Sequence, residues 1–396
     1  MSHPVSCFLF AALFAVSAAL ADNGEIAKFD PRMAVESGIV GADGLLWIDG
    51  RNLPLEGKCF TNTDAFYDRL PANVTAKVNG GVRSMKHHSS GLQFRFTTTS
   101  PTVSFTWVPY DPKRLSMDHM PSTGVSGIDV YTQDAAGRWR YLATGRVPNN
   151  FKDALSKGAL PKCVLNRLTI KPGTPILVNL PLYNGIREFK LGIAKGSTVS
   201  ALPPRKSGVS KPVVFYGTSI THGGCCSRPG MAFVNIVGRD LDVPVVNLGF
   251  SGSGVMEFEM SEHLAAIDAS CYVLDCLWNM GMTKASDVKN RRGRNVDENY
   301  EPFIRNLRAK RPDVPIVMAE RCDVYCRPQN SQDKCIRALY EKLVAEGWKN
   351  LVYLPKDKMY TGDLEGTVDG VHPNDWGMMS MSKAFGAAVK QALNLK

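Results

Sequence analysis

The stretch from Val213 to Gly224 constrains the fold of this chain more than any other. It opens with Val-Val-Phe-Tyr, a β-branched and aromatic run that is typical of a strand buried on both faces. The run stops at Gly217, and Ser219 follows. In an open α/β sheet, ligands bind beyond the carboxyl ends of the strands. A hydroxyl there, beside the N–H groups of a tight turn, is placed to attack a carbonyl carbon, although the same residues also form ordinary strand-ending turns.

The chain after residue 212 alternates strand-like and helical patterns. Further short apolar runs lie at 245–248, 271–275, 314–319 and 351–354, with helical patterns at 232–241, 257–266, 302–310, 332–346 and 375–392. Five strands joined by helices predict a parallel sheet covered on both faces. No Gly-x-Gly-x-x-Gly follows a strand, so a dinucleotide site is not expected.

The residues before this region favour an all-β domain. Seven strand-like runs lie at 92–98, 103–108, 127–133, 138–143, 167–170, 175–180 and 188–193. Turn-forming Gly, Asn and Pro residues separate them, as in a β-sandwich or jelly roll. We therefore expect a sandwich over 23–200, a Gly-, Ser-, Pro- and Lys-containing linker over 201–212, and an α/β domain over 213–396.

The first residues resemble a secretory signal. The run from Val5 to Leu20 is mostly apolar, and Ala19-Leu20-Ala21 fits a cleavage site, which predicts a signal peptide over 1–21. The preceding residues hold no Lys or Arg, and a retained membrane anchor is the alternative. We expect a secreted or periplasmic protein without stable membrane insertion.

Composition and charge narrow the partners. The chain is 44% hydrophobic and 21% charged, as in globular proteins with a sizeable core. Its net charge of +10 favours acidic polymers such as glycans that bear uronic acids. The one dense basic run, 289–294, has no interleaved aromatic residues, so we expect a solvated loop and no nucleic-acid partner.

The cysteines predict neither a metal site nor a disulfide framework. There are ten, and Cys7 lies in the predicted signal, which leaves an odd number in an exported chain. Their spacing matches no metal motif. Cys59 with Cys163, and Cys225 with Cys276, are the pairs that would form accessory bridges. We expect no metal and no organic cofactor.

Ser219 needs a base, because a serine hydroxyl is a weak nucleophile at neutral pH. Of seven histidines, His372 follows the last predicted strand and precedes the last predicted helix, so it lies at the same sheet edge. Asp369, three residues earlier, can turn back to the His372 ring and hold it in one tautomer. These three residues form the predicted triad.

An acyl transfer also needs donors for the oxyanion. The predicted donors are the backbone N–H of Ser219, the backbone of Gly252 after the second strand, and the side-chain amide of Asn279 after the third. Each has an ordinary explanation as a turn or loop residue. Together, on successive strand ends, they predict an oxyanion hole.

At this point the sequence resembles the SGNH (GDSL-type) hydrolases, whose blocks are Ser, Gly, Asn and a late Asp-x-x-His. Ser219, Gly252, Asn279, Asp369 and His372 match these blocks in order. The chain departs from Gly-Asp-Ser-Leu, having Gly-Thr-Ser-Ile, and Met280 stands where an Asp usually follows the Asn.

The sandwich region carries a second resemblance. Gly127-Ile128-Asp129-Val130-Tyr131 is similar to the GxDLY motif of a module found before such hydrolases in bacterial polysaccharide degraders, with Val130 in place of Leu. Together the two resemblances imply a flavodoxin-like three-layer α/β/α domain behind a jelly roll, and an esterase that removes acetyl groups from carbohydrate.

Two other functions stay open. A lipase, lysophospholipase or thioesterase would need an apolar acyl channel, which Trp278, Met280 and Met282 would line. The same three residues are equally consistent with a sugar-stacking platform or with plain packing. A glycan-binding protein would use the sandwich alone. For the esterase we expect Trp278 and Arg228 to contact substrate, and the 111–124 segment to supply a substrate loop. The sequence leaves the oligomeric state open.

Overall fold

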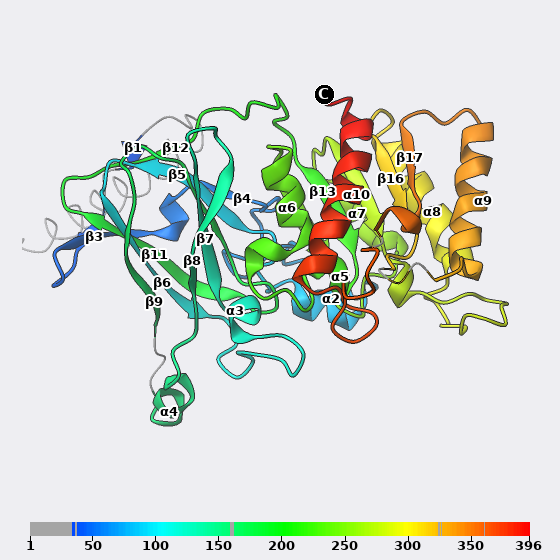
Figure 1. Cartoon of the computed structure of the whole chain (residues 1–396). Helices are drawn as coiled ribbons and strands as arrows, with labels where there is room; N and C mark the ends of the chain where they lie inside the picture. Colours follow the sequence, from blue (N-terminus) through cyan, green and yellow to red (C-terminus); the bar gives the residue numbers. More distant parts are fainter. Residues whose placement is uncertain (1–33, 36–37, 159–161, 324, 326, 360) are drawn as a thin grey trace, which may run out of the picture.

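The computed structural model describes residues 34–35, 38–158, 162–323, 325, 327–359 and 361–396. Figure 1 shows an all-β part beside an α/β part, joined by a segment without helix or strand between Ala201 and Val213. The predicted signal over 1–21 lies outside the described residues. None of the described helices is both long and apolar enough to cross a membrane.

The all-β part is a sandwich of two antiparallel sheets. One has the order β1-β12-β5-β10-β7-β8, with β4 also paired to β5. Its strands are β1 (Ala34–Val35), β4 (Leu55–Glu56), β5 (Gln93–Thr98), β7 (Ile128–Gln133), β8 (Trp139–Gly145), β10 (Ile176–Asn179) and β12 (Val199–Ala201). The other has the order β2-β3-β11-β6-β9. Its strands are β2 (Ile39–Val40), β3 (Leu45–Asp49), β6 (Thr102–Pro109), β9 (Cys163–Thr169) and β11 (Ile186–Ala194). The predicted β-sandwich is confirmed.

Alternating side chains build the sandwich core. Phe94 and Phe96 of one sheet and Phe105 and Phe189 of the other are fully buried or nearly so. Because successive side chains of a strand point to opposite faces, each sheet presents one apolar face to the other. Short helices α2 (Gly80–Met85), α3 (Ser122–Val125) and α4 (Phe151–Ser156) lie in the connections.

The α/β part holds five parallel strands in the order β14-β13-β15-β16-β17. They are β13 (Val213–Gly217), β14 (Val245–Gly249), β15 (Cys271–Asp275), β16 (Ile316–Ala319) and β17 (Leu351–Leu354). Its helices are α5 (Ser219–His222), α6 (Phe233–Asp240), α7 (Phe258–Ala265), α8 (Val296–Lys310), α9 (Ser331–Ala345) and α10 (Asp375–Leu393). This confirms the predicted parallel sheet.

Both faces of the parallel sheet are covered, which explains its continuous apolar strands. Val213 and Phe215 pack with α6 and α10, whereas Val214 and Tyr216 pack with α7, α8 and α9. Successive side chains of β13 therefore point into two separate apolar layers, one on each face of the sheet. The result is a three-layer α/β/α arrangement (Figure 1).

Residues of the N-terminal part pack into both apolar layers of the α/β part. Val82 and Met85 of α2 join the layer of α7 and α8. Leu182 and Tyr183, after β10, join the layer that contains α6 and α10. The sandwich therefore packs on the α/β part near the carboxyl ends of its strands, where it can contribute to a site.

Two sequence expectations are wrong. Helix α8 begins at Val296 rather than Pro302, because Val296 and Tyr300 continue the buried apolar stripe of Phe303 and Leu307. The two cysteine pairs do not form, since all four are free thiols. Cys59 packs on the α/β core and Cys163 in the sandwich core, while Cys276 donates to the Tyr216 carbonyl.

Candidate active site

Ser219 stands at the carboxyl end of β13, as the first residue of α5. The Thr218 hydroxyl caps this short helix by accepting from the Ile220 N–H at 3.2 Å. Gly217 allows the tight turn, because a Cβ there would lie 2.0 Å from the Thr221 hydroxyl. A side chain at 217 would therefore displace the segment that carries Ser219.

Ser219, His372 and Asp369 form a hydrogen-bonded chain. The Ser219 hydroxyl lies 2.8 Å from His372 Nε2, and His372 Nδ1 lies 2.7 Å from Asp369 Oδ2. Ser219 is 7% exposed, so it is shielded from bulk solvent yet not sealed off. The three side chains hold the relative positions of a nucleophile, a base and the acid that orients the base.

The Asp369 loop folds back on itself. The Val368 N–H donates to the His372 carbonyl at 2.9 Å, and the His372 N–H donates to Asp369 Oδ1 at 2.8 Å. Gly370 takes the left-handed conformation (φ +84°) that the turn requires. Burial works against the Asp369 charge, but hydrogen bonds from His372 and Val371 outweigh it and lower the pKa of the carboxyl group to about 2.

The two further oxyanion candidates lie at the same sheet edge. Gly252 is exposed, with φ +65°, in the turn after β14, and Asn279 ends a 3-10 turn after β15. In the amide orientation that satisfies its neighbours, the Asn279 oxygen accepts from the Ser253 and Gly254 N–H groups at 3.1 and 3.2 Å. In this orientation the Asn279 NH₂ group lies on the side of the amide away from Ser253 and Gly254, where it can donate to a ligand. Within the described chain, the Ser219 and Gly252 N–H groups donate to no protein acceptor.

Two residues that hold the backbone of the site in place could not be predicted from the sequence. The buried Arg69 of the sandwich donates to the carbonyls of Asn247 and Gly249, each at 3.0 Å, and so holds the end of β14. The Tyr183 hydroxyl donates to the Ser219 carbonyl at 3.0 Å. Neither lies in a pattern that distinguishes it in sequence, because each acts across the contact between the two parts.

A loop of the sandwich reaches the base. His119, in the 111–124 segment, lies edge-on to His372 with ring centroids 5.6 Å apart. Cys225 lies in the loop after α5, and its Sγ atom is within 4.8 Å of a ring nitrogen of each of these histidines. Burial, with the charges of Asp369 and Asp118, raises the pKa of the Cys225 thiol to about 12.

The two predicted substrate contacts already have protein partners. Arg228 donates to Asp129 Oδ2 at 2.7 Å and also to the Tyr131 hydroxyl, so it joins the α/β part to the Gly127–Tyr131 motif. The Trp278 indole N–H donates to the Cys322 carbonyl, and Arg321 lies over the Trp278 ring at 4.7 Å. A substrate contact at either residue would add to these interactions.

An unexpected carboxyl group lies beneath the site. Asp275 ends β15 and is 1% exposed, accepting from the Thr221 hydroxyl at 2.7 Å and the Cys322 thiol at 3.4 Å. Burial raises the pKa of Asp275 to about 7, because these two donors only partly offset the lost hydration.

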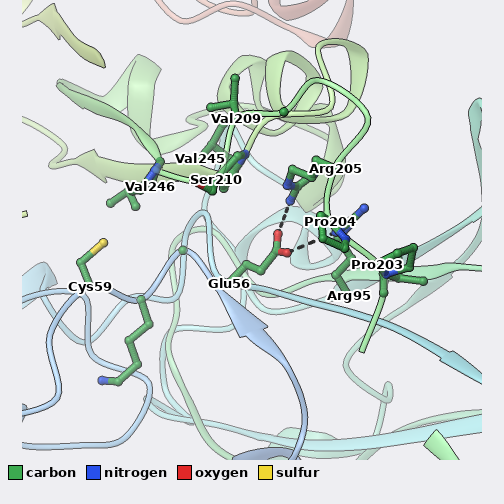
Figure 2. Close-up of a pocket in the computed structure, with 16 residues that line it drawn as sticks. Glu56, Cys59, Arg95, Pro203, Pro204, Arg205, Val209, Ser210, Val245 and Val246 are labelled. Carbon is green, nitrogen blue, oxygen red and sulfur yellow. Dashed lines mark hydrogen bonds and ion pairs between the residues drawn. The ribbon is translucent and has the colours of Figure 1, made fainter. Parts of the chain in front are cut away.

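A pocket of about 500 Å³ lies away from these residues (Figure 2). It opens at the amino ends of the strands, where Pro212 and Pro244 precede β13 and β14. In Figure 2 the Glu56 carboxylate pairs with Arg95 and Arg205. This pocket holds none of the predicted catalytic groups and lies at the edge of the sheet opposite Ser219.

Comparisons with known proteins agree with this architecture. The profile of the GDSL-like Lipase/Acylhydrolase family matches residues 210–390. The GxDLY profile, described as the N-terminus of Esterase_SGNH_hydro-type proteins, matches residues 45–199. No curated protein matches the sequence.

Several solved structures resemble most of this chain, including these three. A putative GDSL-like lipase from Bacteroides ovatus is 27% identical, with a TM-score of 0.75 over 89% of this chain and 99% of its own. The salicylyl-acyltransferase SsfX3 of a tetracycline biosynthetic pathway is 16% identical (TM-score 0.64; 93% and 99% covered). A family two carbohydrate esterase from Clostridium thermocellum is 13% identical (TM-score 0.53; 78% and 93% covered). The last two share the fold alone. From the two profiles and this architecture, the chain belongs to the GDSL-type (SGNH) hydrolase family, in the form that carries an N-terminal GxDLY domain.

Proposed function

We propose that this protein is a secreted or periplasmic serine esterase that removes O-acetyl groups from carbohydrate. The observation that carries the proposal is the chain of hydrogen bonds from Ser219 through His372 to Asp369, at 2.8 and 2.7 Å. A serine hydroxyl becomes a nucleophile when an oriented imidazole accepts its proton.

In the first half-reaction, the Ser219 oxygen attacks the acetyl carbon while His372 Nε2 takes the hydroxyl proton. Asp369 keeps the other ring nitrogen protonated and stabilises the imidazolium that forms. The tetrahedral intermediate collapses, the C–O bond to the sugar breaks, and His372 returns the proton to the sugar oxygen. Water then attacks the acetyl-serine in the same way, with His372 as base, and acetate leaves.

The negative oxygen of each tetrahedral intermediate needs donors that are already in place. The Ser219 and Gly252 N–H groups are free of protein acceptors in the described chain, and the Asn279 amide has its oxygen occupied by Ser253 and Gly254. We assign the oxyanion to these three donors, since preorganised donors stabilise developing charge without reorganisation.

A small acyl group and a carbohydrate alcohol fit this site best. His119 and Cys225 crowd the base on one side, and a Cβ at Gly224 would lie 3.3 Å from His372 Cδ2. Met280 and Met282 are buried in the core beside α7 and α8, so they do not offer a wall for a long acyl chain. The fold is shared with a family two carbohydrate esterase solved with cellohexaose, and the net charge of +10 favours acidic glycans.

The test is acetate release from acetylated xylan, mannan, pectin and peptidoglycan, with aryl acetate and aryl octanoate beside them. The proposal predicts acetate from at least one glycan, faster turnover of acetate than octanoate, and loss of about 10⁴-fold or more in Ser219→Ala. Preference for octanoate would support the lipase alternative. Acyl transfer to an added alcohol in place of water would support an acyltransferase. Glycan binding without hydrolysis would support the binding-protein alternative.

Export is tested separately. Expression of the full chain should give a product in the periplasm or medium whose N-terminus is Asp22. A full-length chain that stays with the membrane fraction would support a retained anchor.

A further inference from the structure

We propose that His119, Cys225 and His372 form a binding site for a borderline-soft divalent cation such as Zn²⁺, and that the bound cation inhibits the esterase by occupying the base. The three residues come from the sandwich loop, the loop after α5 and the loop before α10. One ligating atom of each lies within 4.8 Å of the other two.

The distances require only a small contraction. In a tetrahedral zinc site, bonds of about 2.0–2.3 Å place neighbouring donors roughly 3.3–3.8 Å apart. The nitrogen and sulfur atoms here lie within 4.8 Å of one another, so side-chain rotations that bring them closer by at most about 1.0–1.5 Å give this geometry. Two imidazoles and one thiolate favour zinc over magnesium or calcium, which prefer oxygen ligands.

Both histidines carry the partner that metal-binding imidazoles usually have. His372 Nδ1 is held by Asp369 at 2.7 Å, and His119 Nδ1 is held by Asp118 at 3.0 Å. A carboxylate on Nδ1 fixes the proton there and leaves Nε2 with its lone pair. A Cβ built at Gly224 would lie 3.3 Å from His372 Cδ2, a ring carbon bonded to Nε2, so the His372 ring lies against the segment that leads into Cys225.

The Cys225 backbone is an independent sign of a constrained position. It takes φ +69°, a conformation that non-glycine residues rarely adopt, and its side chain is buried beside the two histidines. On binding, the cation replaces the thiol proton, which passes to solvent, and a thiolate–metal bond forms.

The inhibitory consequence rests on the proposed esterase function, whereas the binding does not. The lone pair of His372 Nε2 is the one that the Ser219 proton needs, and the two atoms are 2.8 Å apart. A cation on that nitrogen removes the base, and Ser219 or a water molecule fills the fourth position. The predicted inhibition is reversible by a chelator.

The test uses the full chain and two readouts. Binding is followed by titration with Co²⁺, whose thiolate complex has a charge-transfer band in the near ultraviolet, in both wild type and Ser219→Ala. Activity is followed as aryl acetate hydrolysis at increasing Zn²⁺. We expect the band in both proteins, inhibition at micromolar Zn²⁺, and recovery with chelator.

The matched variants are Cys225→Ser and Cys335→Ser. Inhibition is measured relative to the turnover of each variant without Zn²⁺. Cys225→Ser should lose the cobalt band and need at least about tenfold more Zn²⁺ for the same fractional inhibition. Cys335→Ser, a half-buried thiol on α9, should behave as wild type. Should Cys225→Ser fold poorly, Cys225→Gly serves, since glycine accepts φ +69° without strain.

A rival cluster supplies the last control. Asp64, Asp68 and His87 also have ligating atoms within 4.8 Å of one another. If His87→Gln, and not Cys225→Ser, abolishes inhibition, or if the cobalt band is absent from wild type, the assignment to Cys225 is wrong. Binding of cobalt without any esterase activity would keep the site and overturn the proposed function instead.

Discussion

The Asp129 carboxylate of the sandwich lies 2.7 Å from the Arg228 guanidinium of the α/β part. Asp129 is fully buried, Arg228 is largely buried, and the same carboxylate also accepts from the Gly230 N–H at 2.8 Å. The acidic residue of the GxDLY motif therefore anchors the loop that follows α5, through Arg228, six residues beyond the end of that helix, and through Gly230. This gives the motif a structural role at the contact between the two parts.

Arg228→Met should destabilise the protein by about 3 kcal/mol, because it leaves the buried Asp129 charge without its partner. Urea unfolding measures this change. The exposed pair of Arg138 with Asp134, in the turn between β7 and β8, is the matched control, and Arg138→Met should cost less than about 1 kcal/mol. In a double-mutant cycle, Asp129→Asn with Arg228→Met should cost less than the sum of the single changes. An additive cycle would show that the pair does not couple.

Asn279→Ala should lower kcat by about 10²–10³-fold with little change in KM, because the amide acts on charge that develops only in the transition state. Steady-state kinetics on an aryl acetate measure the effect. Asn306→Ala, which removes an amide of α8 that donates to Ser261 and Glu262 of α7, is the control and should keep wild-type rates. Equal kcat in the two variants would remove Asn279 from the oxyanion hole.

Asp369→Asn should lose activity at every pH from 4 to 9. Hydrogen bonds hold the folded-state pKa of Asp369 at about 2, below its unfolded value near 3.9, so its orienting charge is present above pH 4 and is lost only as the pH falls through 2. A pH profile of kcat/KM for variant and wild type measures this. Curves that merge at pH 5 would mean that the carboxylate is already neutral there.

Asp275→Asn should change how stability depends on pH. Burial raises the folded-state pKa of Asp275 to about 7, while the unfolded value is near 3.9. Between these values the folded wild type retains a proton that the unfolded chain has lost, so its stability falls as the pH rises, by about 1.4 kcal/mol per pH unit at most. The variant lacks this slope.

Urea unfolding at pH 4.5, 6 and 7.5 measures this. The free energy of unfolding of Asp275→Asn should rise relative to that of wild type at each step to higher pH. The hydrogen bonds from Thr221 and Cys322 to Asp275 affect the difference in free energy of unfolding between variant and wild type at the lowest pH. They do not affect how steeply that difference changes with pH. A constant difference across the three pH values would mean that Asp275 titrates normally in the folded state.

The strands and the positions of the triad residues at their ends could be predicted from the sequence, because both follow from local residue patterns. The apolar run at 213–216 predicted a buried strand, and parallel strands all end at one edge, so Ser219 and His372 were expected to meet. The hydrogen bond between them matches that geometry. The N-terminal domain was expected from the resemblance of residues 127–131 to the GxDLY motif, and the profile match over residues 45–199 confirms it.

The rest depended on contacts that no local pattern carries. Arg69, Tyr183 and His119 act from the sandwich on the α/β part, and their placement follows from how two folded parts pack rather than from periodicity. The start of α8 was missed because Pro302 reads as a helix start, whereas burial of Val296 and Tyr300 extends the helix through it. Both omissions are tertiary effects that override local preference.

The central claim is that His372 activates Ser219. An alkyl fluorophosphonate reacts with activated serines, so its covalent incorporation reports this directly. We predict one equivalent of label in wild type, mapped by mass spectrometry to Ser219, no label there in Ser219→Ala, and labelling slowed by at least about 10²-fold in His372→Ala. A wild-type protein that hydrolyses aryl acetate while Ser219 stays unlabelled, or a His372→Ala variant labelled at the wild-type rate, would contradict the account.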